Sequence, residues 1–253
     1  MSVPGSELRK TWVEPAVDAT LGILEAAMQA PSVKKVVITS SAGAITTLDR
    51  VFGDNIDGVV YTANSRVPDS DYATIKEDPI EHYMASKALA LNATDRFVSE
   101  RRPPFDVINV VPTSVLGRFA MAETPEQLLA NSNDRGLAVA VGNKLGKIPT
   151  GCIHVDDLAK IHVDVLRKET PKYVSFAANV KHSYAQQAET IRKHFPEAVE
   201  DGRFPMDGEI IDRPFELDAQ ATQKFFGWKF QDYPAMVKSV GEQYLELLFR
   251  NTK

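Results

Sequence analysis

Apolar positions along the chain alternate between a helical period and short continuous runs of the kind that buried strands show. From Pro15 to Pro31 the apolar residues recur every three or four positions, which predicts an amphipathic helix. The apolar run Val36–Ile38 comes next and predicts a buried parallel strand. This strand leads into small polar residues that end at Ser41, and open α/β sheets bind ligands at such strand ends.

The same order of helix and strand continues toward the C-terminus. Residues 46 to 79 are polar and irregular, and predict a long surface loop. A second strand over 106–111 is stopped by Pro112 and again leads into polar residues, Thr113 and Ser114. We also predict a strand over 173–176 and helices over 79–101, from Asp156 or Asp157 to Leu166, over 183–194, over 218–227 and from Pro234 to Leu247. This alternation predicts an α/β protein.

Tyr83 and Lys87 lie four positions apart in the helix predicted over 79–101. Residues at i and i+4 share a helix face, so the phenol and the ammonium point the same way. A nearby ammonium favours the phenolate form of a tyrosine, and a serine hydroxyl such as that of Ser41 can hold a substrate carbonyl oxygen. By itself, a Tyr-x-x-x-Lys spacing is far more often a solvated pair, so its meaning depends on companion motifs.

Composition and charge narrow the function classes. The 253 residues include 43% hydrophobic and 25% charged residues, an ordinary globular composition. The net charge of -5, without a basic stripe, argues against nucleic-acid binding. One cysteine, Cys152, leaves no internal disulfide and no cysteine cluster for a metal, and favours a reducing compartment. The N-terminus is polar and no run approaches the ~18 apolar residues of a membrane span, so we expect a cytoplasmic protein.

Four motifs, in this order, resemble the extended short-chain dehydrogenase/reductase family. They are the run Lys34–Ala44, the pair Tyr83-x-x-x-Lys87, the run Val110–Gly117 and the run Ile153–Ala159. The resemblance is strongest to the aldehyde and dihydroflavonol reductase-like members of the NAD-dependent epimerase/dehydratase group. It extends over nearly the whole chain, because Phe226–Phe230 also resembles a late segment of the family.

The resemblance implies a Rossmann-like parallel sheet and a role for five residues. In the family pattern Tyr83 donates the proton, Lys87 supports it and bonds the nicotinamide ribose, and Ser41 orients the substrate carbonyl. Pro112 and Ser114 match the loop beside the nicotinamide. The implied reaction is hydride transfer from NADPH, with NADH as the other possible cofactor, to an aldehyde or ketone of a small metabolite.

The resemblance further implies one extended short-chain reductase-like domain over residues 1–253. A partial Rossmann core is expected at about 12–120 and 153–180. A small C-terminal substrate-binding lobe is expected at about 121–152 and 181–253. The loops over 46–79 and 117–151 would then decide the substrate, because specificity is commonly carried by loops.

The sequence departs from the family at the glycine-rich turn whose helix holds the cofactor pyrophosphate. Gly5 is the only glycine before residue 20, and Val3–Ser6 resembles the segment after the fourth strand of family members. We therefore expect an N-terminally truncated sheet that binds NADPH weakly, because the pyrophosphate contacts are lost. The uncovered sheet edge would then favour association, for example with a second copy of the chain.

Three functions remain open from the sequence. The first is a short-chain reductase acting on a carbonyl compound. The second is a cofactor-independent dehydratase, isomerase or lyase that uses Ser41, Tyr83 and Lys87 for acid-base work alone. The third is a noncatalytic remnant or interaction module. Dinucleotide binding separates the first function from the others, and activity without added cofactor separates the second from the third.

Overall fold

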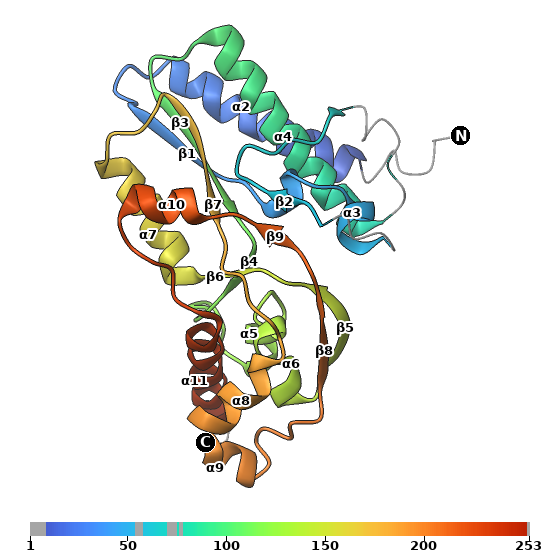
Figure 1. Ribbon diagram of the computed structural model, residues 1–253. Helices are drawn as coiled ribbons and strands as arrows, with labels where there is room; N and C mark the ends of the chain where they lie inside the picture. Colours follow the sequence, from blue (N-terminus) through green and yellow to red (C-terminus); the bar gives the residue numbers. More distant parts are fainter. Residues whose placement is uncertain (1–8, 54–57, 70–74, 76–77, 252–253) are drawn as a thin grey trace. The chain divides into compact units, whose positions relative to one another are not determined.

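The computed structural model describes residues 9–53, 58–69, 75 and 78–251. The Val3–Ser6 segment lies outside the described residues. The chain divides into two compact units by its packing. Unit 1 comprises residues 1–112, 161–177 and 217–226, and unit 2 comprises residues 113–160, 178–216 and 227–253. Each unit has its own strands and helices, drawn in Figure 1.

Unit 1 is built on a three-stranded sheet in the order β1 (Lys35–Thr39), β3 (Asp106–Pro112) and β7 (Tyr173–Ala178). β1 and β3 pair in parallel, from Lys35 opposite Asp106 to Thr39 opposite Val110. The predicted strands and their parallel arrangement are therefore confirmed. These strands carry the apolar runs because both faces of the sheet are covered by helices.

The two faces of the sheet follow from the period of two along β1. Val36 and Ile38 pack with Leu24 of α2 (Glu14–Met28) and Phe97 of α4 (Pro79–Arg101) in one apolar cluster. On the other face, the hydroxyl of Thr39 lies 2.8 Å from His162 Nε2 of α7 (Val155–Arg167). Figure 1 shows α2 and α4 on one side of the sheet, and α7 with α10 (Gln220–Phe226) on the other.

Helix α4 begins and ends at recognisable capping residues. The carboxylate of Asp78 accepts hydrogen bonds from the backbone N–H groups of Ile80 and Glu81, and Pro79 occupies the first turn. The helix ends at Arg102, which adopts the left-handed conformation with a φ of 45°. The prediction of a helix over 79–101 is confirmed.

The segment over 46–79 is not a loop throughout. It contains α3 (Leu48–Phe52) and the short strand β2 (Val60–Tyr61), which pairs with β9 (Glu216–Leu217). Elements of five and two residues are too short to show a hydrophobic period, so the pattern alone does not reveal them. Two further short helices occur in unit 1, η1 (Arg9–Val13) and η2 (Ala42–Ala44).

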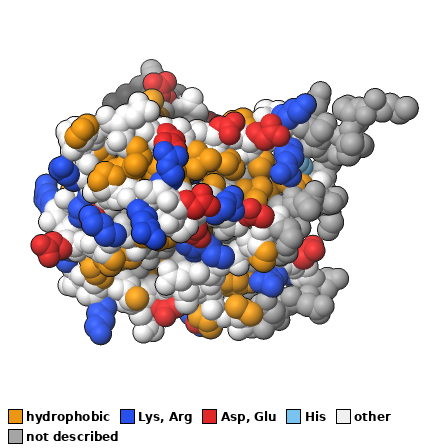
Figure 2. Space-filling view, turned by 90° about the horizontal axis from the view of Figure 1, so that it is seen from above, with side chains coloured by type: hydrophobic (Ala, Val, Ile, Leu, Met, Phe, Trp, Pro, Cys, Tyr) orange, Lys and Arg blue, Asp and Glu red, His pale blue; other side chains and the backbone are white. Residues whose placement is uncertain are grey.

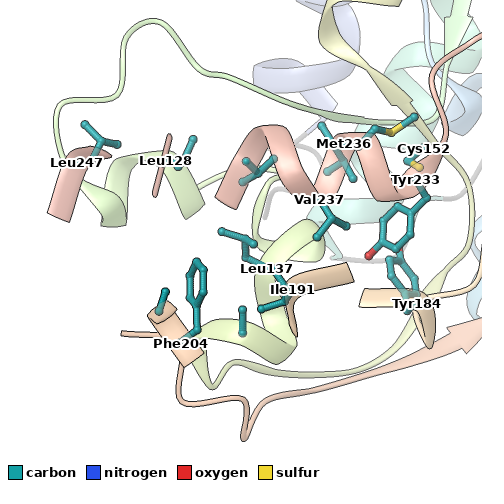
Figure 3. Packing of buried hydrophobic residues seen from close by; sticks show 14 of the residues in the cluster. Leu128, Leu137, Cys152, Tyr184, Ile191, Phe204, Tyr233, Met236, Val237 and Leu247 are labelled. Carbon is teal, nitrogen blue, oxygen red and sulfur yellow. The ribbon is translucent and has the colours of Figure 1, made fainter. Parts of the chain in front are cut away.

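Unit 2 packs its helices around one apolar core. The parallel pairs are β4 (Ser114–Leu116) with β6 (Cys152–His154), and β5 (Lys144–Pro149) with β8 (Glu209–Arg213). The helices are α5 (Pro125–Leu129), α6 (Asp134–Val141), α8 (Gln186–His194), α9 (Pro196–Glu200) and α11 (Tyr233–Asn251). Figure 3 shows Leu137 of α6, Ile191 of α8 and Val237 of α11 meeting in this core.

Two expected helix caps are wrong. Helix α7 begins at Val155, and the ring nitrogen Nδ1 of His154 accepts the backbone N–H of Asp156 at 3.1 Å. Asp157 instead accepts the backbone N–H of Gln231 at 2.6 Å. Helix α8 begins at Gln186, three residues after the expected start, because the hydroxyl of Ser183 accepts the N–H of Ala185 in a preceding turn.

The surface shows charges of both signs. In the view of Figure 2, apolar side chains form a broken band across the face, with acidic and basic side chains interleaved around it. Across the part of the chain that the structure describes, no helix is both long enough and apolar enough to span a membrane.

Candidate active site

Tyr83 and Lys87 share one face of α4, as their spacing predicts. The Lys87 ammonium nitrogen lies 6.0 Å from the centre of the Tyr83 ring. The Tyr83 side chain is 38% exposed, so its phenol is accessible to a substrate. Lys87 is half-buried and forms no ion pair with a residue in the described ranges. The pair thus presents an exposed tyrosine beside a cation that no carboxylate of the described residues neutralises.

Ser41 lies two residues beyond the carboxyl end of β1. Its backbone is extended, and its hydroxyl oxygen accepts the N–H of Gly43 at 3.0 Å, which caps the short helix η2. A hydroxyl that accepts one hydrogen bond can still donate its own proton. The local turn therefore fixes the Ser41 side chain and leaves its proton available for an acceptor.

Gly43 brings Ser41 and Tyr83 to the same place. A Cβ atom built on Gly43 would lie 3.4 Å from Ser41 Oγ, 3.4 Å from Tyr83 Cε1 and 3.3 Å from Met84 Cγ. Ser41 Oγ and the Tyr83 ring therefore flank one small space. The distance between Ser41 Oγ and Tyr83 Cε1 is at most the sum of their two 3.4 Å distances from the Gly43 Cβ position. The absence of a side chain at residue 43 lets η2 approach α4 closely.

The remaining predicted residues lie at the end of β3 and beyond it. Pro112 is the last residue of β3 and is buried in unit 1. Ser114 begins β4 in unit 2, where its hydroxyl accepts a hydrogen bond from the Arg135 guanidinium. Unit 1 thus brings together Ser41, Tyr83 and Lys87. The nicotinamide-side role of Pro112 and Ser114 remains a prediction.

His82, which directly precedes Tyr83, is a residue that the sequence patterns do not single out. His82 is fully buried and its Nδ1 lies 2.9 Å from the backbone oxygen of Asp78. A histidine in the first turn of a helix gives no distinctive pattern, so only the folded structure reveals this contact.

Cys152 has a histidine neighbour that the sequence does not indicate. Its sulfur lies 3.4 Å from Nδ1 of His182, thirty residues further along the chain. Burial raises the pKa of the Cys152 thiol far above its usual range and lowers the pKa of His182. A protonated thiol is a poor nucleophile, and Cys152 belongs to the core of unit 2.

Within the described ranges, no three His, Cys, Asp or Glu side chains are grouped so as to hold a metal ion. The predicted site residues of unit 1 carry a hydroxyl, a phenol and an ammonium, the groups that acid-base chemistry uses. A serine after one parallel strand lies near a tyrosine on the helix that precedes the next strand of the sheet, and a lysine lies beside that tyrosine. This arrangement defines a class of α/β enzymes that protonate or deprotonate an oxygen atom.

Comparisons with known proteins place the chain within that class. No protein-family model matches the sequence. A ketoreductase of Cercospora nicotianae is 32% identical over 245 residues, which cover 92% of this chain and 66% of that protein. An NAD-dependent epimerase/dehydratase of Gibberella moniliformis is 30% identical over 262 residues, covering 96% of this chain and 71% of that protein.

A solved structure agrees with the fold. The yeast methylglyoxal/isovaleraldehyde reductase Gre2, complexed with NADPH, superposes with a TM-score of 0.73 at 22% identity. The superposition covers 96% of this chain and 73% of that one. The chain belongs to the short-chain dehydrogenase/reductase family, in its NAD-dependent epimerase/dehydratase group. Its Rossmann-like fold is thereby confirmed, and it spans 66% of the length of the Cercospora relative.

Proposed function

We propose that the chain is an NAD(P)-dependent oxidoreductase that reduces an aldehyde or ketone of a small organic metabolite. The observation that carries the proposal is the approach of Ser41 Oγ and the Tyr83 ring to one space across Gly43. Two hydroxyl-bearing side chains at one point suit a substrate with a single reacting oxygen. The names of two relatives, a ketoreductase and an NAD-dependent epimerase/dehydratase, support the same chemistry.

The residues of the site fit a dinucleotide cofactor. A half-buried ammonium without an ion pair in the described ranges, beside an exposed phenol, supplies donors that suit the hydroxyls of a ribose. Lys87 and Tyr83 would hold the nicotinamide ribose, and Pro112 and Ser114 would lie beside the nicotinamide. When bound, the reduced cofactor supplies the hydride for the carbonyl carbon.

The chain's own residues handle the oxygen and the proton. The Ser41 hydroxyl donates a hydrogen bond to the substrate carbonyl oxygen, because its acceptor side is already engaged by Gly43. Tyr83 then gives its phenolic proton to that oxygen as the carbonyl carbon becomes tetrahedral. The Lys87 ammonium stabilises the phenolate that remains. One hydride and one proton convert the carbonyl to an alcohol.

The proposal is tested with the purified chain, NADPH or NADH, and a panel of small aldehydes and ketones. We expect loss of the reduced cofactor only when a carbonyl compound is present, and formation of the matching alcohol. Calorimetry measures the affinity for each cofactor. Product formation without any cofactor would contradict the proposal and would indicate a dehydratase, isomerase or lyase instead.

We also propose a homo-oligomer in a reducing, cytoplasmic compartment. β1 lies at the end of the strand order in its sheet, and Ile23 of α2 and Leu166 of α7 expose 62% and 59% of their surface. A free, buried Cys152 thiol is compatible with that compartment. Light scattering on the purified chain tests the oligomer, and imaging of a tagged chain in cells tests the location.

A further inference from the structure

We propose that His82 is a positioning residue that holds the Tyr83 phenol in its working place; this inference rests on the proposed reductase function. His82 directly precedes Tyr83 in α4, yet the two side chains have opposite environments. His82 has no exposed surface, whereas Tyr83 is 38% exposed. The imidazole is thus anchored in the protein while its neighbour reaches outward to the site.

The anchor is a pair of hydrogen bonds to one carbonyl group. The backbone oxygen of Asp78 accepts the backbone N–H of His82 at 3.0 Å, and Nδ1 of the His82 ring lies 2.9 Å from the same oxygen. Because a carbonyl oxygen can only accept, Nδ1 carries the proton. Asp78 also caps the helix, since its side chain accepts from Ile80 and Glu81. Asp78 therefore ties the whole first turn to the His82 ring.

The second ring nitrogen of His82 argues that the imidazole does more than fill space in the core. Its other nitrogen, Nε2, is buried and has no hydrogen-bond partner among the residues that the structure describes. Leaving a buried polar atom unpaired disfavours the folded state, and an apolar side chain of similar size would avoid that cost. The benefit that offsets this cost is the Nδ1 bond, which an apolar side chain could not make.

The first turn of α4 needs this restraint because its position sets the site. Tyr83 and Met84 both lie 3.3–3.4 Å from the place where a Gly43 Cβ would be, so the turn packs directly on η2. A rotation of the turn about the helix axis would move the phenol away from Ser41. Displacements of about 1 Å at a reacting group can cost about 100-fold in rate.

The experiment compares three variants at His82 in the full chain. Asparagine carries its amide nitrogen at the position of Nδ1, so His82→Asn keeps the bond to Asp78. Glutamine carries it at the position of Nε2, so His82→Gln loses that bond. His82→Phe keeps the ring volume but makes neither bond. Ser99→Ala, an exposed change further along α4, is the matched control. Circular dichroism establishes that each variant is folded.

We expect His82→Phe and His82→Gln to lower kcat by about 10- to 100-fold. The KM for NADPH should rise by a smaller factor than kcat falls, because Lys87, the other residue proposed to hold the ribose, is untouched. His82→Asn should keep kcat within about threefold of the unchanged chain, and the pH profile of kcat should shift in His82→Phe and His82→Gln but not in His82→Asn. The same kcat in all three variants would overturn the positioning role. A kcat that falls by the same factor in His82→Asn as in His82→Phe would also overturn it.

A second readout does not depend on turnover. The NMR signals of the Tyr83 ring, assigned through Tyr83→Phe, report its surroundings directly. They should be the same in His82→Asn as in the unchanged chain, and should move in His82→Phe. If the unchanged chain reduces no carbonyl compound, the proposed function fails, and these signals still decide the role of His82. Identical Tyr83 signals in His82→Phe and the unchanged chain would show that the imidazole does not position the phenol.

Discussion

Ser41 and Tyr83, which are 42 positions apart in the sequence, flank the same point above Gly43, each with an atom 3.4 Å from where a Cβ would stand. Ser41 follows the end of a strand, and Tyr83 lies near the beginning of the next long helix, just after its first turn. Parallel pairing of β1 with β3 requires a helical crossover, and that crossover carries Tyr83 and Lys87 back over the strand end. The meeting of Ser41 and Tyr83 is therefore a product of the sheet's topology.

The phenol of Tyr83 is expected to supply the proton. Tyr83→Phe should lower kcat by about 10²–10⁴-fold, because the ring keeps its packing and loses only the hydroxyl. Lys87→Met should lower kcat by a similar factor, since the phenolate then lacks its neighbouring charge. NADPH consumption with the best carbonyl compound measures both variants, and Ser99→Ala serves as the control. Full turnover by Tyr83→Phe would show that the mechanism is wrong.

The Ser41 hydroxyl is expected to hold the substrate oxygen. Ser41→Ala should lower kcat by about 100-fold, the usual effect of losing one donor to a developing oxyanion. It also removes the acceptor for Gly43 N–H, so the free energy of unfolding should fall by about 1 kcal/mol. Urea unfolding separates the two effects. An unchanged kcat would assign Ser41 to capping only.

Gly43 tests the close approach of η2 and α4. Gly43→Ala places a methyl group 3.3–3.4 Å from three side-chain atoms, so those neighbours must move by a few tenths of an ångström. We expect kcat to fall by about 10-fold through displacement of the phenol. Gly22→Ala is the control, because a Cβ there meets nothing within 4 Å. Gly22 lies in α2, so that variant should gain about 0.5–1 kcal/mol of stability.

Asp95 of α4 holds a partly buried ion pair with Arg66. The Arg66 Nε to Asp95 Oδ2 distance is 2.6 Å, and Tyr173 of β7 also donates to this carboxylate. Asp95→Ala should lower the free energy of unfolding by about 1–3 kcal/mol, because two donors lose their acceptor. Asp69→Ala breaks the more exposed pair with Arg96 and should cost about 0–1 kcal/mol. Equal costs in urea unfolding would contradict the difference in burial.

His182 predicts a loss of stability in acid. Burial lowers the pKa of His182 from its ordinary value of 6.5, so the unfolded chain binds this proton more readily than the folded protein does. The contribution of His182 to stability is therefore complete above pH 6.5 and is lost as the pH falls below that value. Urea midpoints measured across this range should decline, and the decline should be shallower in His182→Phe. Identical slopes in the two proteins would refute this origin.

The sequence by itself determined the family and the chemistry to be tested. The continuous apolar runs predicted the three parallel strands, because strands buried on both faces must be apolar throughout. The i and i+4 spacing placed Tyr83 and Lys87 on one helix face, because that relation depends only on local helix geometry. Asp78 and Pro79 gave α4 a readable beginning for the same local reason.

The tertiary structure decided how distant residues meet. The short elements α3, β2, β4 and β6 carry too few residues for a hydrophobic period. Cys152 and His182 lie thirty positions apart, so only folding makes them neighbours. The approach of Ser41 to Tyr83 and the burial of His82 are likewise packing results. Side-chain packing brings together residues that are distant in the sequence, and local sequence patterns do not indicate which of them will be in contact.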